Sequence, residues 1–138
     1  MERYINEIIA LSNKAYKKGE IPVGAIVVRN GKIIGKGYNK KEQTNVCVNH
    51  AEVIAISKAE KKLKTWRLDD CDLYVTLKPC DMCLNLIKQA RIRNVYYLIE
   101  SNYNNENHKE INQIKINNYE EISKSYQQKF VEFFRSKR

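Results

Sequence analysis

Apolar side chains recur three or four positions apart in two segments near the ends of the chain. This spacing predicts amphipathic helices over residues 4–18, ended by Gly19, and over residues 120–137. The apolar faces consist of Tyr4, Ile8, Leu11 and Ala15 in the first segment and of Ile122, Tyr126, Phe130, Phe133 and Phe134 in the second. Each helix therefore has one face that must be buried against another layer of structure.

A hairpin is predicted after the first helix. Residues 21–28 and 33–35 are apolar runs, and they flank Asn30 and Gly31, a pair typical of a tight hairpin turn. Residues 39–49 are polar and show no periodicity. We expect a loop there.

Helices and strands alternate in the second half of the chain. Residues 50–63 and 79–90 show helical spacing, residues 73–77 and 94–99 are apolar runs typical of buried strands, and residues 111–116 predict a short edge strand. No repeat or linker divides the chain, so its 138 residues are expected to form one domain. The order of elements predicts a three-layer α/β/α sandwich, with a central mixed sheet of about five strands and helices on both faces.

Metal-ligating side chains fall where two of these helices begin. His50 stands two residues before Glu52, and Cys80 and Cys83 lie on one face of a turn that Pro79 opens. One imidazole and two thiolates are three protein ligands of a tetrahedral zinc ion, which leaves the fourth position for water. Glu52 is suited to carry protons between that water and a substrate. The pattern predicts one catalytic zinc ion per chain, with Glu52 as general acid and base.

Two other interpretations of these residues are open at the level of the sequence. Cys47 stands three residues before His50 and, with the cysteine pair, completes a Cys₃His structural zinc site of the kind found in RNA-binding zinc ribbons. The chain would then be a binding module and not an enzyme. Glu52 also follows Asn49 at the spacing of a capping box, in which it would only stabilise the helix.

The amino-acid composition limits which binding partners and which cellular compartment the protein is expected to have. Lys and Arg number 25 against 16 Asp and Glu, and the net charge of +9 favours a polyanionic partner, although the abundance of Lys, Asn and Ile also fits an AT-rich genome. Four clustered cysteines do not make a disulfide framework, and no apolar run approaches the roughly 18 residues of a membrane span. We expect a cytoplasmic protein without membrane contact. The aromatic and basic residues at the end of the chain, Phe134 and Arg135 among them, can stack a base and hold a phosphate.

The motifs resemble those of bacterial tRNA adenosine deaminases of the cytidine deaminase-like superfamily, whose signature is His-x-Glu followed by Pro-Cys-x-x-Cys. The likeness covers nearly the whole chain. Besides the metal-binding motifs it takes in residues 21–25, 37–39, 73–77, 90–92 and 132–135. The resemblance implies hydrolytic deamination of adenosine to inosine at the wobble position of a tRNA anticodon loop, by a homodimer whose RNA groove uses both subunits. It also implies that Val23 and Asn39 line the base pocket and that Phe134 packs near the flanking nucleotides.

The chain departs from this family in two places. Lys78 replaces the acid of the family's Thr-Leu-Glu-Pro-Cys motif and reverses a charge beside the site. The family's Gly-Ala-x-Asp turn aligns with residues 98–101, Leu-Ile-Glu-Ser, and the segment that follows is shorter than in the family. A guanine, cytosine or cytidine deaminase on the same scaffold is the alternative enzyme.

Overall fold

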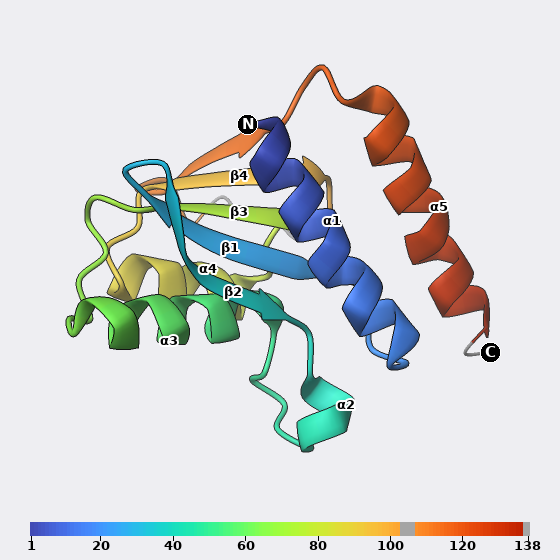
Figure 1. The fold of residues 1–138 in the computed structure, drawn as a ribbon, viewed down its shortest axis with the longest axis horizontal. Coiled ribbons are helices and arrows are strands. Elements are labelled where there is room, and N and C mark those ends of the chain that lie inside the picture. The colour runs from blue at the N-terminus through green and yellow to red at the C-terminus, as the bar shows by residue number, and fades with distance from the viewer. Residues whose placement is uncertain (103–106, 137–138) are drawn as a thin grey trace.

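The chain folds into three layers, a central sheet with helices packed on both faces (Figure 1). The computed structural model describes residues 1–102 and 107–136. Its helices are α1 (Glu2–Lys17), α2 (Lys41–Thr44), α3 (Ala51–Leu63), α4 (Asp81–Gln89) and α5 (Glu120–Ser136). Its strands are β1 (Gly24–Arg29), β2 (Lys32–Tyr38), β3 (Asp72–Leu77), β4 (Asn94–Ile99) and β5 (Asn112–Lys115). The predicted α/β sandwich with a five-stranded mixed sheet is confirmed.

The sheet combines an antiparallel half with a parallel half. Its strand order is β2-β1-β3-β4-β5, with β1 antiparallel to β2 and β3, and with β3, β4 and β5 parallel. The turn between β1 and β2 holds Asn30 at φ 50° and Gly31 at φ 76°, the left-handed values that a two-residue hairpin turn requires. Because of this pairing, the same end of the sheet contains the start of β1 and the last residues of β2 and β3.

Each face of the sheet is buried in its own apolar core. In β1, Ala25 and Val27 join the core beneath α3 and α4, whereas Ile26 and Val28 join the core beneath α1 and α5. A strand covered on both faces needs apolar side chains at successive positions, which explains the continuous apolar run in the sequence. Full burial of one such side chain stabilises the fold by about 1.5–3 kcal/mol.

Two glycines of β2 let α3 lie directly against the sheet. A Cβ added to Gly37 would lie 2.4 Å from the Ala51 carbonyl oxygen, and one added to Gly35 would lie 2.2 Å from the Ala55 carbonyl oxygen. Favourable contacts of carbon atoms are about 3.5–4.0 Å long, so a side chain at either position would push α3 outward. The glycines thus set how closely the first turns of α3 approach β2.

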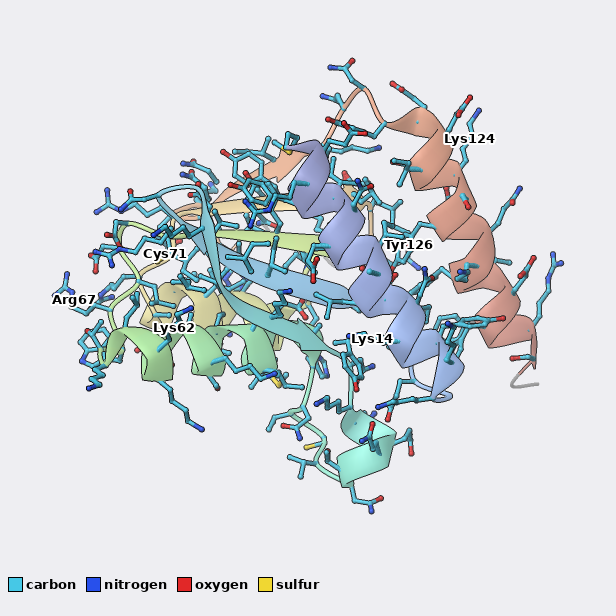
Figure 2. The ribbon with its side chains drawn as sticks, viewed as in Figure 1. Lys14, Lys62, Arg67, Cys71, Lys124 and Tyr126 are labelled. Carbon is cyan, nitrogen blue, oxygen red and sulfur yellow. The ribbon has the colours of Figure 1, made fainter. Side chains whose placement is uncertain are left out.

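Helix α5 is tied to segments that lie far away in the sequence. Tyr126 lies between α5 and α1 (Figure 2), and its hydroxyl donates a hydrogen bond to the Pro22 carbonyl oxygen at 2.5 Å. Burial raises the pKa of Tyr126, which keeps this hydroxyl protonated as a donor. Lys129 Nζ donates to Asn13 Oδ1 on α1 at 2.6 Å. The two contacts hold α5 against α1 and against the segment that leads into β1.

Some element boundaries differ from the sequence predictions. The first helix begins at Glu2, two residues earlier than the apolar spacing indicated. The predicted loop over residues 39–49 contains α2, whose four residues are too few to show a period. The last helix extends to Ser136, and Lys137, its predicted end, lies outside the described residues. Within the described part of the chain, no helix combines the length and the apolar character needed to cross a membrane.

Candidate active site

Three metal-ligating side chains from two helices converge where β3 ends. His50 Nδ1 lies 3.5 Å from Cys83 Sγ and 3.9 Å from Cys80 Sγ. All three ligand atoms lie within 4.8 Å of one another. The fold thus brings together the three residues that the sequence predicts as zinc ligands.

The donor set and its spacing fit a zinc ion. A tetrahedral zinc ion with Zn–N bonds of about 2.0–2.1 Å and Zn–S bonds of about 2.3 Å holds its nitrogen and sulfur ligands about 3.6 Å apart. The distances of 3.5 and 3.9 Å lie on either side of that value. Two soft sulfurs and an imidazole suit zinc, whereas calcium and magnesium prefer oxygen ligands. The group can therefore hold one zinc ion with three protein ligands.

Both ligand groups stand at helix N-termini. His50 is the N-cap of α3 and Cys80 is the N-cap of α4, each with an extended backbone and no capping hydrogen bond from its side chain. The positive end of each helix dipole stabilises negative charge at this place. Two predicted helix starts are wrong. Asn49 lies one residue before the cap of α3, and its side-chain amide donates to the Thr44 hydroxyl at 2.8 Å. Pro79, predicted to open the second helix, lies two residues before Asp81, where α4 begins. Both ligands remain on the first turns.

Cys47 does not join the ligand cluster. It is exposed in the segment between α2 and α3. Among the described residues, the group of ligand atoms that converge consists of His50, Cys80 and Cys83. The Cys₃His structural site that the sequence allowed is therefore not formed in this structure.

Glu52 is a buried acid beside the metal ligands. The residue is 4% exposed on the first turn of α3, and burial raises its pKa to about 7. A capping box would direct the Asn49 backbone N–H to this carboxylate, but that N–H donates to the Val46 carbonyl oxygen at 3.0 Å. The hydrogen bond that defines a capping box is therefore not formed at Glu52. A carboxyl group that titrates near neutral pH can both accept and return a proton.

The pKa values of the two cysteine thiols are shifted in opposite directions. A hydrogen bond from Cys83 lowers the pKa of Cys80 to about 4, whereas donation to Cys80 and burial raise the pKa of Cys83. The hydrogen bond with Cys80 also raises the pKa of His50. A metal ion needs two thiolates and a neutral imidazole, so its binding must release protons from this group.

A pocket of about 210 Å³ opens beside the metal ligands. Its wall is formed by Ile21, Val23, Asn39, Lys41, His50, Ala51, Glu52, Leu77, Lys78 and Cys80. The Asn39 backbone N–H donates to the Val23 carbonyl oxygen at 3.1 Å, which fixes these two residues side by side at the pocket. The volume lies below the roughly 300–1,000 Å³ of pockets for drug-sized ligands and suits one flat heterocycle.

Glu20 supports the pocket wall through α2, a role that the sequence did not predict. It is 1% exposed, and its carboxylate accepts hydrogen bonds from the backbone N–H groups of Glu42 at 3.0 Å and Gln43 at 2.6 Å. These bonds fix α2 and with it the segment that leads from the pocket to His50. The only signal in the sequence is a single acid before an apolar run, because its partners lie more than 20 positions away.

His108 supports the first turn of α4 and was also missed. It is 3% exposed, and its Nε2 lies 2.6 Å from Asp81 Oδ1. Asp81 directly follows the ligand Cys80, so this contact ties the ligand turn to the segment before β5. The Asn-rich surroundings of His108 show no period that would have indicated a buried side chain.

The predicted substrate contacts on α5 lie outside the pocket wall. Phe134 is 43% exposed, and its ring lies 5.0 Å from that of Phe130 and 5.3 Å from that of Phe133. Arg135 is exposed at the next position. Contact of these two residues with RNA stays a prediction. Lys78, in contrast, lines the pocket, so the charge reversal noted in the sequence lies inside the site.

Comparison with known proteins places the chain among deaminases. Over 96 residues it is 43% identical to the tRNA-specific adenosine deaminase of Bacillus subtilis, an overlap that covers 70% of this chain and 60% of that protein. The chain thus spans about three fifths of the length of this curated relative. A solved structure from studies of A-to-I editing by tRNA:A34 deaminases matches with a TM-score of 0.77 and 28% identity, covering 83% of this chain and 98% of the other.

A guanine deaminase structure is similar as well. The enzyme from Bacillus subtilis matches with a TM-score of 0.68 and 40% identity, covering 72% of this chain and 64% of the other. The family model for MafB19-like deaminases matches residues 1–138. With a complete set of zinc ligands, a buried acid beside them and this match over its full length, the chain belongs to the MafB19-like deaminase family.

Proposed function

We propose that the protein converts adenosine at the wobble position of a tRNA anticodon loop to inosine, with water consumed and ammonia released. The observation that carries the proposal is a buried acid, Glu52, in the wall of a base-sized pocket that also contains His50 and Cys80. The relatives named tRNA-specific adenosine deaminases support this substrate. The net charge of +9 supports a polyanionic one.

The chain's own residues divide the work of such a reaction. A zinc ion held by His50, Cys80 and Cys83 would supply a water molecule whose pKa is lowered to about 7. Glu52 takes a proton from the attacking water and delivers it to the adenine ring nitrogen next to C6. It then passes the second proton of that water to the amino group, which departs as ammonia. The wall around Glu52 keeps the base in reach of the carboxylate and limits the access of bulk water.

Deamination of guanine is the second candidate. The 40% identity with the guanine deaminase structure favours it almost as strongly as the relatives favour tRNA. A free base would occupy the same pocket and use the same acid. The two candidates differ in whether the substrate carries phosphates, and therefore in how strongly turnover depends on salt.

The homodimer and the cytoplasm implied by the resemblance and the composition are part of the proposal. Size-exclusion chromatography with light scattering tests the homodimer. The measured mass should be twice the 16.2 kDa of one chain. All four cysteines are free, which suits a reducing compartment.

Inosine formation in tRNA tests the proposed function. Zinc-loaded protein is incubated with bacterial tRNA, the tRNA is digested to nucleosides, and inosine is measured by mass spectrometry. Sequencing of the treated tRNA should place the change at the wobble position. Absence of inosine, together with conversion of guanine to xanthine in a parallel incubation with free guanine, would replace this function with the second candidate.

A further inference from the structure

Lys78 places a cation in the wall of the base pocket. Its side chain is 20% exposed, and its Nζ lies 3.5 Å from Glu100 Oε2 and 5.3 Å from the centre of the Tyr97 ring. The Lys78 backbone N–H donates to the Ile99 carbonyl oxygen at 3.0 Å, which joins the segment after β3 to the end of β4. The chain therefore holds this lysine in a defined place beside the zinc ligands.

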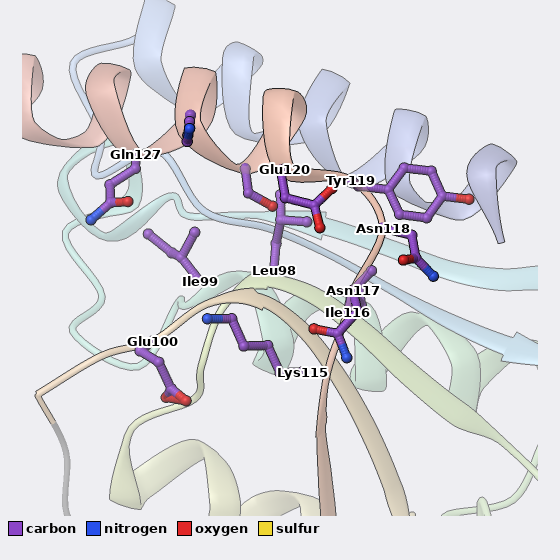
Figure 3. Close-up of a pocket in the computed structure, with 12 residues that line it drawn as sticks. Leu98, Ile99, Glu100, Lys115, Ile116, Asn117, Asn118, Tyr119, Glu120 and Gln127 are labelled. Carbon is purple, nitrogen blue, oxygen red and sulfur yellow. The ribbon is translucent and has the colours of Figure 1, made fainter.

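Glu100, the partner of Lys78, lines a second and larger cavity. This cavity of about 410 Å³ lies between the ends of β4 and β5 and the first turns of α5. Figure 3 shows Glu100 and Lys115 on the strand side of it, with Glu120 and Gln127 on α5 across from them. The Tyr97 hydroxyl donates to Glu100 Oε1 at 2.8 Å and fixes the carboxylate.

The ion pair joins the walls of the two cavities. Lys78 lines the smaller cavity and Glu100 lines the larger one, and 3.5 Å separates their charged atoms. The smaller cavity takes one base. A strand that delivers this base must continue past the mouth of the pocket, and the larger cavity provides room for the adjoining nucleotide.

We propose that Lys78 binds the backbone phosphate next to the target nucleotide, and that Glu100 holds the lysine in place while no RNA is bound. This inference rests on the proposed function, because a free base carries no such phosphate. The lysine ammonium is a compact charge with three donors, suited to a phosphate. Glu100 is 53% exposed, and an exposed ion pair of this kind adds little stability, so a phosphate can take its place.

RNA binding by variants of the two residues tests the contact. Fluorescence anisotropy measures the affinity of zinc-loaded protein for an anticodon stem-loop with adenosine at the wobble position, over a range of salt concentrations. Lys78→Gln should weaken binding several-fold and reduce the slope of log affinity against log salt by about 0.7, the value of one phosphate on a single strand. Glu100→Gln should tighten binding because it frees Lys78. A merely structural ion pair would weaken binding in both variants alike.

The chain offers a matched control in Lys88 and Glu110. Their charged atoms are 3.3 Å apart and their side chains are 23% and 65% exposed, close to the 20% and 53% of the proposed pair. Lys88→Gln and Glu110→Gln report how RNA binding responds to one charge anywhere on this surface. Equal effects of Lys88→Gln and Lys78→Gln would overturn the proposal.

A stem-loop with one neutral methylphosphonate, on the 5′ or the 3′ side of the target adenosine, locates the contact. One of the two substitutions should weaken binding to the wild type as much as Lys78→Gln does, and should have no further effect on that variant. Additive effects at both positions would overturn the contact. If the contact is found but no inosine forms, the proposed function fails and the phosphate site stands. If inosine forms while Lys78→Gln binds RNA like the wild type, the phosphate site fails alone, and absence of RNA binding by the wild type overturns both.

Discussion

Gly37 packs against the first turn of α3, which positions His50 and Glu52. Replacing it with alanine would put a Cβ 2.4 Å from the Ala51 carbonyl oxygen, 2.8 Å from the Ala55 nitrogen and 2.9 Å from Ile54 Cβ. The shortest of these contacts falls about 1 Å below the roughly 3.5 Å of a favourable contact. We therefore expect Gly37→Ala to move the first turn of α3 outward by about 1 Å.

This movement should reduce both stability and turnover. Overpacking of a buried site costs about 1–3 kcal/mol of unfolding free energy. His50 and Glu52 stand on the displaced turn, and a misplacement of about 1 Å can lower the rate about 10²-fold. Urea unfolding and inosine formation, both measured on zinc-loaded protein of known metal content, give the two quantities.

Gly35→Ala is the control for this prediction. Its Cβ would meet the Ala55 carbonyl oxygen at 2.2 Å and the Ala59 nitrogen at 3.0 Å, one to two turns further along α3. The loss of stability should be similar to that of Gly37→Ala, with a smaller loss of turnover. Equal turnover in the two variants, or wild-type turnover in Gly37→Ala, would refute the argument that β2 positions the catalytic turn.

Three further predictions concern the metal, the acid and the end of the chain. Glu52→Gln should keep its zinc and lose about 10²–10⁴-fold in turnover, because the amide cannot carry protons; near-normal deamination would exclude the proton-transfer role. Cys47→Ala should retain one zinc ion and substantial turnover, whereas Cys80→Ala should lose the zinc measured by elemental analysis; loss of zinc from Cys47→Ala as well would favour the structural site. Deletion of residues 134–138 should weaken action on the anticodon stem-loop with zinc content intact, because exposed Phe134 and its basic neighbours are removed; unchanged activity would show that this end does not contact RNA.

The zinc ligands could be predicted because their signals are local. Cys80 and Cys83 lie three positions apart at the start of a helix, and His50 and Glu52 lie at the start of another. The three-residue spacing of the two cysteines places them on one face of a helical turn whatever the tertiary structure is. The cap of α3 was predicted one residue too early because the Asn49 side chain bonds to Thr44.

The supports of the site could not be predicted, because their partners are distant in the sequence. Glu20 bonds to backbone groups more than 20 positions later, and His108 lies 27 positions from Asp81. Neither residue belongs to a periodic face. The contact between Lys78 and Glu100 depends on the parallel pairing of β3 with β4, which brings the ends of the two strands together. Local sequence patterns therefore predicted the fold class and the zinc ligands, whereas the contacts that support the site depend on tertiary packing.

Competition between the two candidate substrates tests the central claim most directly. Zinc-loaded protein is given an anticodon stem-loop with adenosine at the wobble position and free guanine in the same solution, and inosine and xanthine are followed by mass spectrometry. We predict that inosine forms at the wobble position, that xanthine does not form, and that added salt slows the reaction because phosphate contacts are screened. Formation of xanthine without inosine would contradict the assignment to tRNA.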